Sequence, residues 1–317
     1  KTKKEAKIFD ANKSATPNCN MYFEQFVERY VEDKKNELKA RTLIMKADIT
    51  NRHILPYFGD KRLSDIKSAD IIQWKNHILD QGFSPAYVRT IDNQFGAYFT
   101  HASLHYGLRE NPCKKVKKMG TFNRRLEYLT FDEYKKFIAM YPQGSRNHAI
   151  FQTLAFTGMR CGELLALTKE DIDLENRKIS INKTFYRKNQ IDYITPPKTA
   201  ESVRTISIPV FLAEELRAYM DSIPDLKDDE RIFPVVAETI QHSMKNMLAK
   251  AGLKHVPVHG WRHFFASYLI SQGVEAIVIK EMLGHKDIKM TLNVYGHLYP
   301  NRQEEVTELL DRVINME

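Results

Sequence analysis

The spacing of apolar residues changes period along this chain, and that change limits the folds the chain can adopt. Over most of its length apolar residues repeat every three or four positions, as Phe23, Phe26 and Tyr30 do. This is the period of an amphipathic helix. Three segments between residues 177 and 209, "RKISIN", "QIDYIT" and "VRTISIP", instead alternate with the period of two that strands require. The sequence therefore predicts a mostly α fold with one small antiparallel β-sheet.

Turn and capping residues divide the chain into four parts. Residues 1–20 lack periodicity and are expected to form a flexible tail. Helical stretches with short loops over residues 21–110 predict an all-helical domain. Residues 111–126, which follow, have no apolar period and are predicted to be a basic linker. A capping box in "TFDE" then begins a second, α+β domain over residues 127–317.

The distribution of charge indicates a polyanionic partner. Residues 1–126 contain 24 Lys and Arg against 14 Asp and Glu, a net of +10, whereas the remaining residues contain 24 against 26, a net of −2. A basic part on an otherwise balanced chain favours nucleic acid. The alternative is that the basic surface only aids solubility and that the basic linker is merely a solvated connector between the domains. The candidate phosphate contacts are the basic side chains of the linker: Lys114, Lys115, Lys117, Lys118, Arg124 and Arg125.

Several common functions lack their patterns here. No Gly precedes a Lys, no two Gly stand two apart, and no His precedes a Glu, which excludes the P-loop, the dinucleotide fingerprint and the HExxH zinc site. The three cysteines fit neither a disulfide framework nor a zinc cluster, so we expect a reducing cytosol. No run approaches the roughly 18 apolar residues of a membrane span. The chain begins without Met, and we expect a fragment or a processed product.

The segment "VHGWRHFFASYL", residues 258–269, allows a metal site or an anion site. On a helix, His259 and His263 would share a face, but no third metal ligand stands nearby in the sequence. Arg262 lies in this apolar segment and Arg160 in another, "FTGMRCGELLAL", and a buried guanidinium needs a partner. Glu163 could satisfy Arg160 as an ordinary ion pair. Two such arginines together could form a fork for a phosphate.

Five segments, in this order, resemble the tyrosine recombinase family, the integrases of phages and conjugative transposons. They are "TGMRCGELLAL", the Lys198 strand turn, "HGWRH", "LGH" and "TLNVYGHL". The resemblance covers residues 21–317, including "ILPYFGDKRLSDI" and "RENP" in the front domain. It implies a core-binding domain and a catalytic domain that close like a clamp around double-stranded DNA. Relatives from mobile elements often carry a further N-terminal arm-binding domain, which we expect to have been removed.

The resemblance also implies a set of catalytic residues: Arg160, Lys198, His259, Arg262, His285 and Tyr295. Tyr295 would attack the phosphate and form a covalent 3′-phosphotyrosine, while the two arginines bind the non-bridging oxygens. Lys198 would protonate the leaving 5′-oxygen, and the two histidines would hydrogen-bond the phosphate and assist proton transfer. Glu163 would support Arg160. The resemblance implies neither a metal nor a cofactor.

Some alternatives stay open beside this assignment. Tyr268 and Tyr299 are rival nucleophiles, expected to be packing aromatics, and His263 is expected to be a surface or interface histidine. Trp261, Phe264 and Gly260 depart from the residues usual in the family, which we expect to alter packing rather than chemistry.

Three other functions compete with a recombinase: a type IB topoisomerase, a catalytically silent DNA-binding protein on this fold, and a metal-dependent nuclease. The last segment, "RQEEVTELLDRVINME", has one apolar stripe and predicts a C-terminal exchange helix. The resemblance implies that this helix docks on a neighbouring protomer of a DNA-bound tetramer, with attachment or transposon-end sites as the DNA. An accessory excision factor is a further expected partner.

Overall fold

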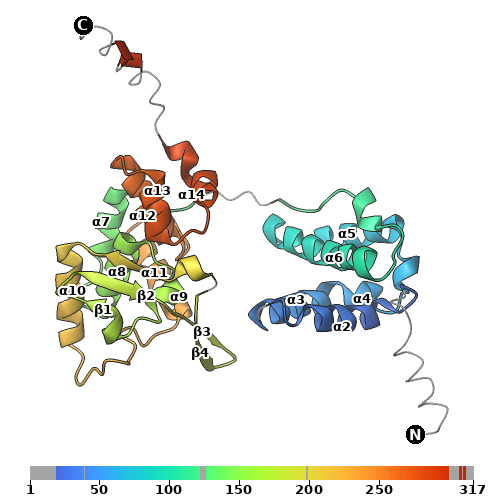
Figure 1. The fold of residues 1–317 in the computed structure, drawn as a ribbon, viewed down its shortest axis with the longest axis horizontal. Helices are drawn as coiled ribbons and strands as arrows, with labels where there is room; N and C mark the ends of the chain where they lie inside the picture. Colours follow the sequence, from blue (N-terminus) through green and yellow to red (C-terminus); the bar gives the residue numbers. More distant parts are fainter. Residues whose placement is uncertain are drawn as a thin grey trace. The chain divides into compact units, whose positions relative to one another are not determined.

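The structure, a computed structural model, describes residues 19–38, 40–121, 126–197, 199–299, 307–308 and 310–311. The chain divides into two compact units, with the boundary between Arg124 and Arg125 (Figure 1). Within the described residues, no helix is long and apolar enough to cross a membrane.

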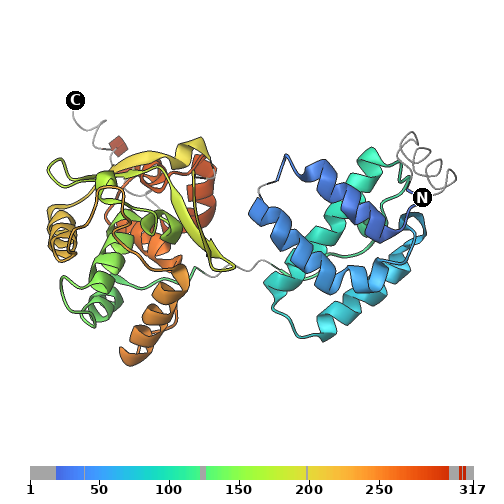
Figure 2. The same ribbon diagram turned by 90° about the horizontal axis from the view of Figure 1, so that it is seen from below.

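The first unit has no β-strand among its described residues, in keeping with its helical apolar period (Figure 2). Short 3₁₀ helices, labelled η, join its α-helices. The elements in chain order are α2 (Phe23–Lys34), α3 (Ala40–His53), α4 (Leu55–Phe58), η1 (Leu63–Asp65), α5 (Ser68–Asp80), α6 (Pro85–His105) and η2 (Pro112–Lys115).

An aromatic cluster forms the core of the first unit. Phe58, Trp74 and Phe95 are each at most 1% exposed, and the Trp74 and Phe95 ring centroids lie 4.5 Å apart. The long helix α6, which carries Phe95, begins at the Ser-Pro pair: the Ser84 hydroxyl accepts a hydrogen bond from a first-turn amide, and Pro85 follows at the first helical position. The cap therefore fixes where the central helix enters the core.

The segment after this helix, which the sequence predicts to be a basic linker, is bound to the first unit over part of its length. Lys75 on α5 and Asp92 on α6 form a buried ion pair at 2.7 Å, with side chains 8% and 7% exposed. The Lys75 Nζ also donates to the Lys117 carbonyl at 2.8 Å, and the Met119 amide donates to Asp92 Oδ2 at 3.2 Å. This segment is thus bound to the first unit as far as Met119, which is itself buried.

The basic side chains of that segment remain available to a partner. Lys114, Lys115, Lys117 and Lys118 are exposed, although Lys115 Nζ lies 2.5 Å from a carboxylate oxygen of Glu110. The other two predicted phosphate contacts, Arg124 and Arg125, fall in residues 122–125, outside the described residues.

The second unit combines helices with short strands. Its elements are α7 (Phe131–Ile138), α8 (Arg146–Thr157), α9 (Cys161–Leu164), η3 (Lys169–Asp171), β1 (Ile172–Asp173), β2 (Lys178–Ile181), β3 (Thr184–Lys188), β4 (Ile191–Thr195), η4 (Ala200–Ser202), β5 (Arg204–Ser207), α10 (Val210–Asp221), α11 (Ala237–Lys250), α12 (Gly260–Ser271), α13 (Ala276–Leu283), α14 (Ile288–Tyr295) and η5 (Gly296–Leu298). The predicted capping box is present at the start of α7, where Glu133 N–H donates to Thr130 Oγ1 at 3.2 Å.

The strands form two small antiparallel sheets rather than the single sheet that the sequence predicts. One has the order β1–β2–β5, and the other is the β3–β4 hairpin. The prediction missed the two-residue strand β1 and the strand β3, "TFYRK". Strand β3 pairs with β4, which is exposed at most positions. Together, β3 and β4 form a hairpin that projects from the rest of the second unit (Figures 1 and 2).

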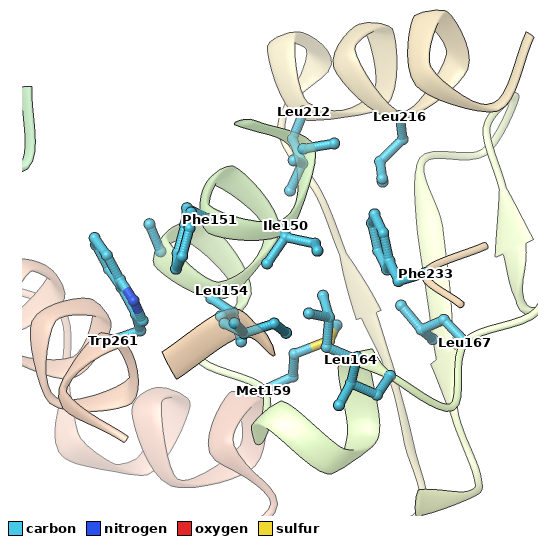
Figure 3. Packing of buried hydrophobic residues seen from close by; sticks show 14 of the residues in the cluster. Ile150, Phe151, Leu154, Met159, Leu164, Leu167, Leu212, Leu216, Phe233 and Trp261 are labelled. Atoms are coloured by element: carbon cyan, nitrogen blue, oxygen red, sulfur yellow. The ribbon is translucent and has the colours of Figure 1, made fainter. Parts of the chain in front are cut away.

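Helix α8 is the centre of the second core and determines where α12 lies. In Figure 3, Ile150 on α8 lies toward Leu212 of α10, and Phe151 lies toward Trp261 of α12. Trp261 is 2% exposed, its ring centroid lies 5.6 Å from that of Phe151, and its Nε1 donates to Met244 Sδ at 3.2 Å. This residue, one of the departures from the family pattern, therefore packs in the core and anchors the helix that carries Arg262.

Breaking the buried pair in the first unit should reveal how strongly it stabilises the fold. We expect Lys75→Met to lower the free energy of unfolding by about 3–5 kcal/mol, because Asp92 would remain buried without a counter-charge. The double variant Lys75→Met/Asp92→Leu should regain most of this loss, since apolar side chains of similar volume often replace a buried pair. Urea unfolding followed by tryptophan fluorescence measures both. If the single and double variants lose the same free energy of unfolding, the stabilisation comes mainly from the hydrogen bonds to residues 117–119 instead.

Candidate active site

Arg160 is positioned by the turn between α8 and α9. Gly158 ends α8 with a φ of 60°, and a Cβ there would lie 2.4 Å from the Phe265 ring, so only glycine fits. Arg160 then caps α9. Its Nη1 lies 2.6 Å from Glu163 Oε1, and its backbone amide donates to Glu163 Oε2 at 2.9 Å. The Arg160 side chain is 38% exposed, so it can reach a ligand from solvent while Glu163 holds it.

Glu163 is shared by a second arginine that the sequence analysis missed. Arg204 on β5 donates from Nη2 to Glu163 Oε2 at 3.0 Å and from Nε to the Met282 carbonyl at 2.8 Å. Burial by itself would raise the pKa of the Glu163 carboxyl, but Arg204 and Arg160 outweigh it and hold that pKa below its usual value. The strand alternation contained a signal, because Arg204 shares the face of Ile206, which is buried.

Arg262 joins two helix ends. The residue is 3% exposed, and it donates from Nη1 to the Gly158 carbonyl at 3.0 Å and from Nη2 to the Leu283 carbonyl at 2.7 Å. Burial and, to a lesser extent, the Arg160 charge lower the pKa of its guanidinium to about 9, while the Glu163 charge opposes them. The group therefore stays protonated at neutral pH. Two of its five donors fix its plane, as an anion-binding fork requires.

His285 follows the next glycine turn. Gly284 ends α13 with a φ of 65°, and His285 is 8% exposed with its Nδ1 2.9 Å from Thr291 Oγ1. Burial lowers the pKa of the imidazole to about 4, and the charges of Arg262 and Arg160 act in the same direction. His285 is therefore neutral at pH 7 and can donate or accept a hydrogen bond, but it is a weak base.

Tyr295 is the last residue of α14 and is 2% exposed. Burial raises the pKa of its hydroxyl to about 12, although the Arg262 charge opposes this shift. Its Oη lies 2.8 Å from Nδ1 of His263 on α12. The prediction that His263 is a surface or interface histidine is therefore wrong: the side chain is half-buried and contacts the candidate nucleophile. Its position four residues after His259, the residue that caps the same helix, was the available signal.

The remaining predicted residues are placed as follows. His259 precedes α12, is exposed, and its ring centroid lies 5.0 Å from that of His263; its charge also contributes to lowering the pKa of His285. The structure thus brings Arg160, Arg262, His259, His285 and Tyr295 together with Glu163. Lys198, predicted to lie in the β4–β5 turn, falls outside the described residues.

The hydroxyls and rings of the two rival tyrosines make ordinary packing contacts. The Tyr268 ring stacks on Phe131 at 4.9 Å, and the Tyr299 hydroxyl donates to the Val274 carbonyl at 3.4 Å. Both contacts are those of packing aromatics.

The arrangement favours binding of an anion. Arg160 and Arg204 both pair with the Glu163 carboxylate, and the charge of Arg262 also interacts with it, so the half-buried site has an excess of positive charge. The described residues contain no group of three His, Cys, Asp or Glu that could hold a metal ion. A phosphate beside a tyrosine hydroxyl is the ligand that this chemistry suits.

Comparison with known proteins gives family matches over both units. Residues 127–302 match the phage integrase family, and residues 22–79 match the phage integrase N-terminal SAM-like domain. The ICEBs1 integrase of Bacillus subtilis is 30% identical over 334 residues, covering 99% of this chain and 91% of that protein. The transposase from transposon Tn916 of Enterococcus faecalis is 26% identical over 308 residues, covering 88% of this chain and 73% of that protein.

Solved structures share the fold. The Tn1549 transposon integrase in complex with transposon right end DNA superposes with a TM-score of 0.74 at 20% identity, covering 93% of this chain and 100% of that chain. A lambda integrase tetramer bound to a Holliday junction has a TM-score of 0.64 at 20% identity, covering 90% and 79%.

Neutralising the shared carboxylate should destabilise the site. We expect Glu163→Gln to lower the free energy of unfolding by about 3–5 kcal/mol at pH 7, because Arg160 and Arg204 would lose their shared buried counter-charge and Arg262 a nearby one. The pKa of Glu163 is lower in the folded protein than in the unfolded chain. The contribution of Glu163 to the free energy of unfolding is therefore full above the ordinary carboxylate pKa, and it is lost as the pH falls through the pKa of Glu163 in the folded protein.

Denaturant unfolding at neutral and acid pH measures this effect. The difference between the wild type and Glu163→Gln should shrink on acidification. The control is Glu214→Gln, an exposed glutamate of α10, which should change stability by no more than about 0.5 kcal/mol. A constant difference at all pH values would contradict the assigned charge state.

Proposed function

The chain belongs to the phage integrase family of tyrosine recombinases, and from that membership we propose which of its residues cut and rejoin DNA. The protein is a site-specific recombinase of a mobile genetic element that acts in integration and excision. The observation that carries the assignment of residues is the position of Arg262: its buried guanidinium donates to the Gly158 carbonyl, two residues before Arg160, and to the Leu283 carbonyl, two residues before His285.

Arg160 and Arg262 bind the two non-bridging oxygens of the scissile phosphate. Their planar, permanently charged groups suit the charge that builds on phosphorus-bound oxygens in the transition state. His285 and His259 hydrogen-bond the same phosphate. His285 is neutral in the DNA-free site, and an entering phosphate supplies the negative charge that raises its pKa.

Tyr295 is the nucleophile. Its oxygen forms a bond to phosphorus, the bond to the 5′-oxygen breaks, and the DNA is held as a 3′-phosphotyrosine with a free 5′-hydroxyl. Lys198 protonates the leaving 5′-oxygen, which is otherwise a poor leaving group. The covalent bond keeps the energy of the phosphodiester, so a 5′-hydroxyl of a second duplex can attack it and complete strand exchange without a cofactor or metal.

The relatives favour this function over its rivals. A type IB topoisomerase would share the tyrosine chemistry and reseal the same strand, but the relatives named above are an integrase and a transposase. A catalytically silent DNA-binding protein would not need a set of catalytic side chains, whereas five of the predicted catalytic side chains lie in one site.

Covalent trapping tests the proposal. A nicked DNA site that loses its 5′-hydroxyl fragment after cleavage should accumulate a protein–DNA adduct through a 3′-phosphate. Tyr295→Phe should abolish the adduct and leave DNA affinity within about twofold, since the variant lacks the attacking oxygen alone. Tyr299→Phe serves as the matched control and should form adduct normally. Denaturing gels with labelled DNA, in EDTA, measure the yield. Adduct formed by Tyr295→Phe, or loss of adduct in EDTA, would overturn the assignment.

The exposed lysines of the 111–120 segment contact the phosphate backbone of double-stranded DNA at attachment or transposon-end sites. The protein acts on DNA in the bacterial cytoplasm, as an oligomer, with four protomers joined through residues 301–317 and with an accessory factor in excision. The lambda integrase tetramer on a Holliday junction supports a tetramer, and the apolar stripe of residues 301–317 supports their role in joining protomers.

Removing the C-terminal residues tests the assembly. Truncation before Asn301 should leave binding of a single site intact and reduce DNA-bound oligomers at least tenfold, because the joining segment is absent. Native gels with one-site and two-site DNA separate the two effects. Oligomers that form as in the full chain would contradict this role.

A further inference from the structure

A half-buried histidine with no role in the proposed function touches the proposed nucleophile. His263 Nδ1 lies 2.8 Å from Tyr295 Oη, and the two rings meet at 61° with centroids 5.6 Å apart. His263 directly follows Arg262 on α12, whereas Tyr295 ends α14. The helix that holds the phosphate-binding guanidinium therefore also places an imidazole on the attacking oxygen.

We propose that His263 is a catalytic residue that accepts the proton of the Tyr295 hydroxyl during attack and returns it during rejoining. This inference rests on the function proposed above. With its hydrogen on Nε2, His263 offers the Nδ1 lone pair to the hydroxyl. As the Oη–phosphorus bond forms, the O–H bond breaks and the proton passes to Nδ1, while the leaving 5′-oxygen takes a different proton from Lys198. Rejoining runs these transfers in reverse.

The buried hydroxyl requires such a base. With its pKa raised to about 12, roughly one Tyr295 in 10⁵ would be ionised at pH 7. Arg262 stabilises the phenolate as it forms but takes no proton. A base within hydrogen-bond reach satisfies the geometric condition for general-base catalysis.

The other two histidines are less suited to this step. His285 is surrounded by Arg262, Arg160 and Arg204, and its pKa of about 4 makes it a weak proton acceptor. Its Nδ1 also contacts Thr291. His259 is exposed, and its ring centroid lies 5.0 Å from that of His263. A ring nitrogen of His263 is in direct contact with Tyr295 Oη.

The same hydrogen bond could instead keep Tyr295 in an inactive, buried position, a role we call storage. Because Tyr295 is 2% exposed, His263 could hold the tyrosine in a covered position that opens on DNA binding. The two roles predict opposite effects of removing the imidazole, since loss of a base slows cleavage and loss of a latch does not.

The experiment measures single-turnover cleavage of the nicked site by full-length His263→Ala and His263→Asn. Asparagine keeps a hydrogen-bonding atom near the Nδ1 position but cannot accept a proton at neutral pH. Both variants should cleave about 10²–10⁴-fold more slowly than the wild type, the usual range for a lost general base. His242→Asn, an exposed histidine of α11, is the matched control and should cleave at the wild-type rate.

Thermal unfolding and DNA affinity, measured on each variant, identify a folding defect. If His263→Ala does not fold, the milder His263→Asn carries the test. Cleavage by His263→Ala at or above the wild-type rate would overturn the proposal in favour of storage. A full rate in His263→Asn would overturn it in favour of simple positioning.

A substrate with sulfur at the bridging 5′ position separates base from acid. A thiolate leaves without a proton, so this substrate should restore cleavage by Lys198→Ala but not by His263→Asn. Restoration of His263→Asn would show that His263 serves the leaving group instead. Failure of the wild type to form any adduct would overturn the proposed function itself, whereas normal adduct formation in the His263 variants would overturn this inference alone.

Discussion

The site depends on the two bonds from the Arg262 guanidinium to backbone carbonyls. One carbonyl belongs to Gly158 at the end of α8, and the other belongs to Leu283 at the end of α13. Helix ends have carbonyls without partners inside the helix, and they carry partial negative charge. A buried cation between two such ends satisfies them and is stabilised by them. Three helices are thereby fixed around one group, and the side chains that follow each glycine turn, Arg160 and His285, converge on it.

This arrangement also explains the roles of the buried ionisable groups. A single carboxylate, Glu163, lies between Arg160 and Arg204, and its charge does not balance the guanidinium groups around it. Burial first, and this imbalance second, lower the pKa of His285, and the Arg262 charge partly offsets the effect of burial on the pKa of Tyr295. The charge excess thus helps to keep His285 neutral and favours the phenolate of the nucleophile. Arg204 takes part through Glu163 and the Met282 carbonyl, so β5 is tied to the turn before His285.

Much of this could be predicted from the sequence, because glycine turns and arginines in apolar helices leave clear local signals. Arg160 and Arg262 are examples, since each guanidinium in an apolar segment requires a partner. The local sequence signals gave wrong predictions where tertiary contacts determine the environment of a residue or the pairing of a strand. His263 looks like an ordinary helix-surface residue until α14 brings Tyr295 to it, and the separation of β3–β4 from the other strands is set by pairing rather than by alternation. The basic segment after residue 110 has no apolar period, yet Lys75 and Asp92 bind its backbone. Lys198 lies outside the described residues, as do all of residues 301–317 except 307–308 and 310–311, so their roles stay predictions.

The charge excess links stability to function. Like charges held close together in a half-buried site destabilise the protein without DNA, and the fold tolerates them because Arg262 and Glu163 are hydrogen-bonded on several sides. A phosphate that enters the site supplies the missing negative charge, so it binds the folded state and stabilises it by mass action. Little reorganisation of the arginines is then needed when charge develops on the phosphate oxygens, because their donors are already oriented. The free energy of folding therefore keeps the arginine side chains in the orientation that the transition state requires.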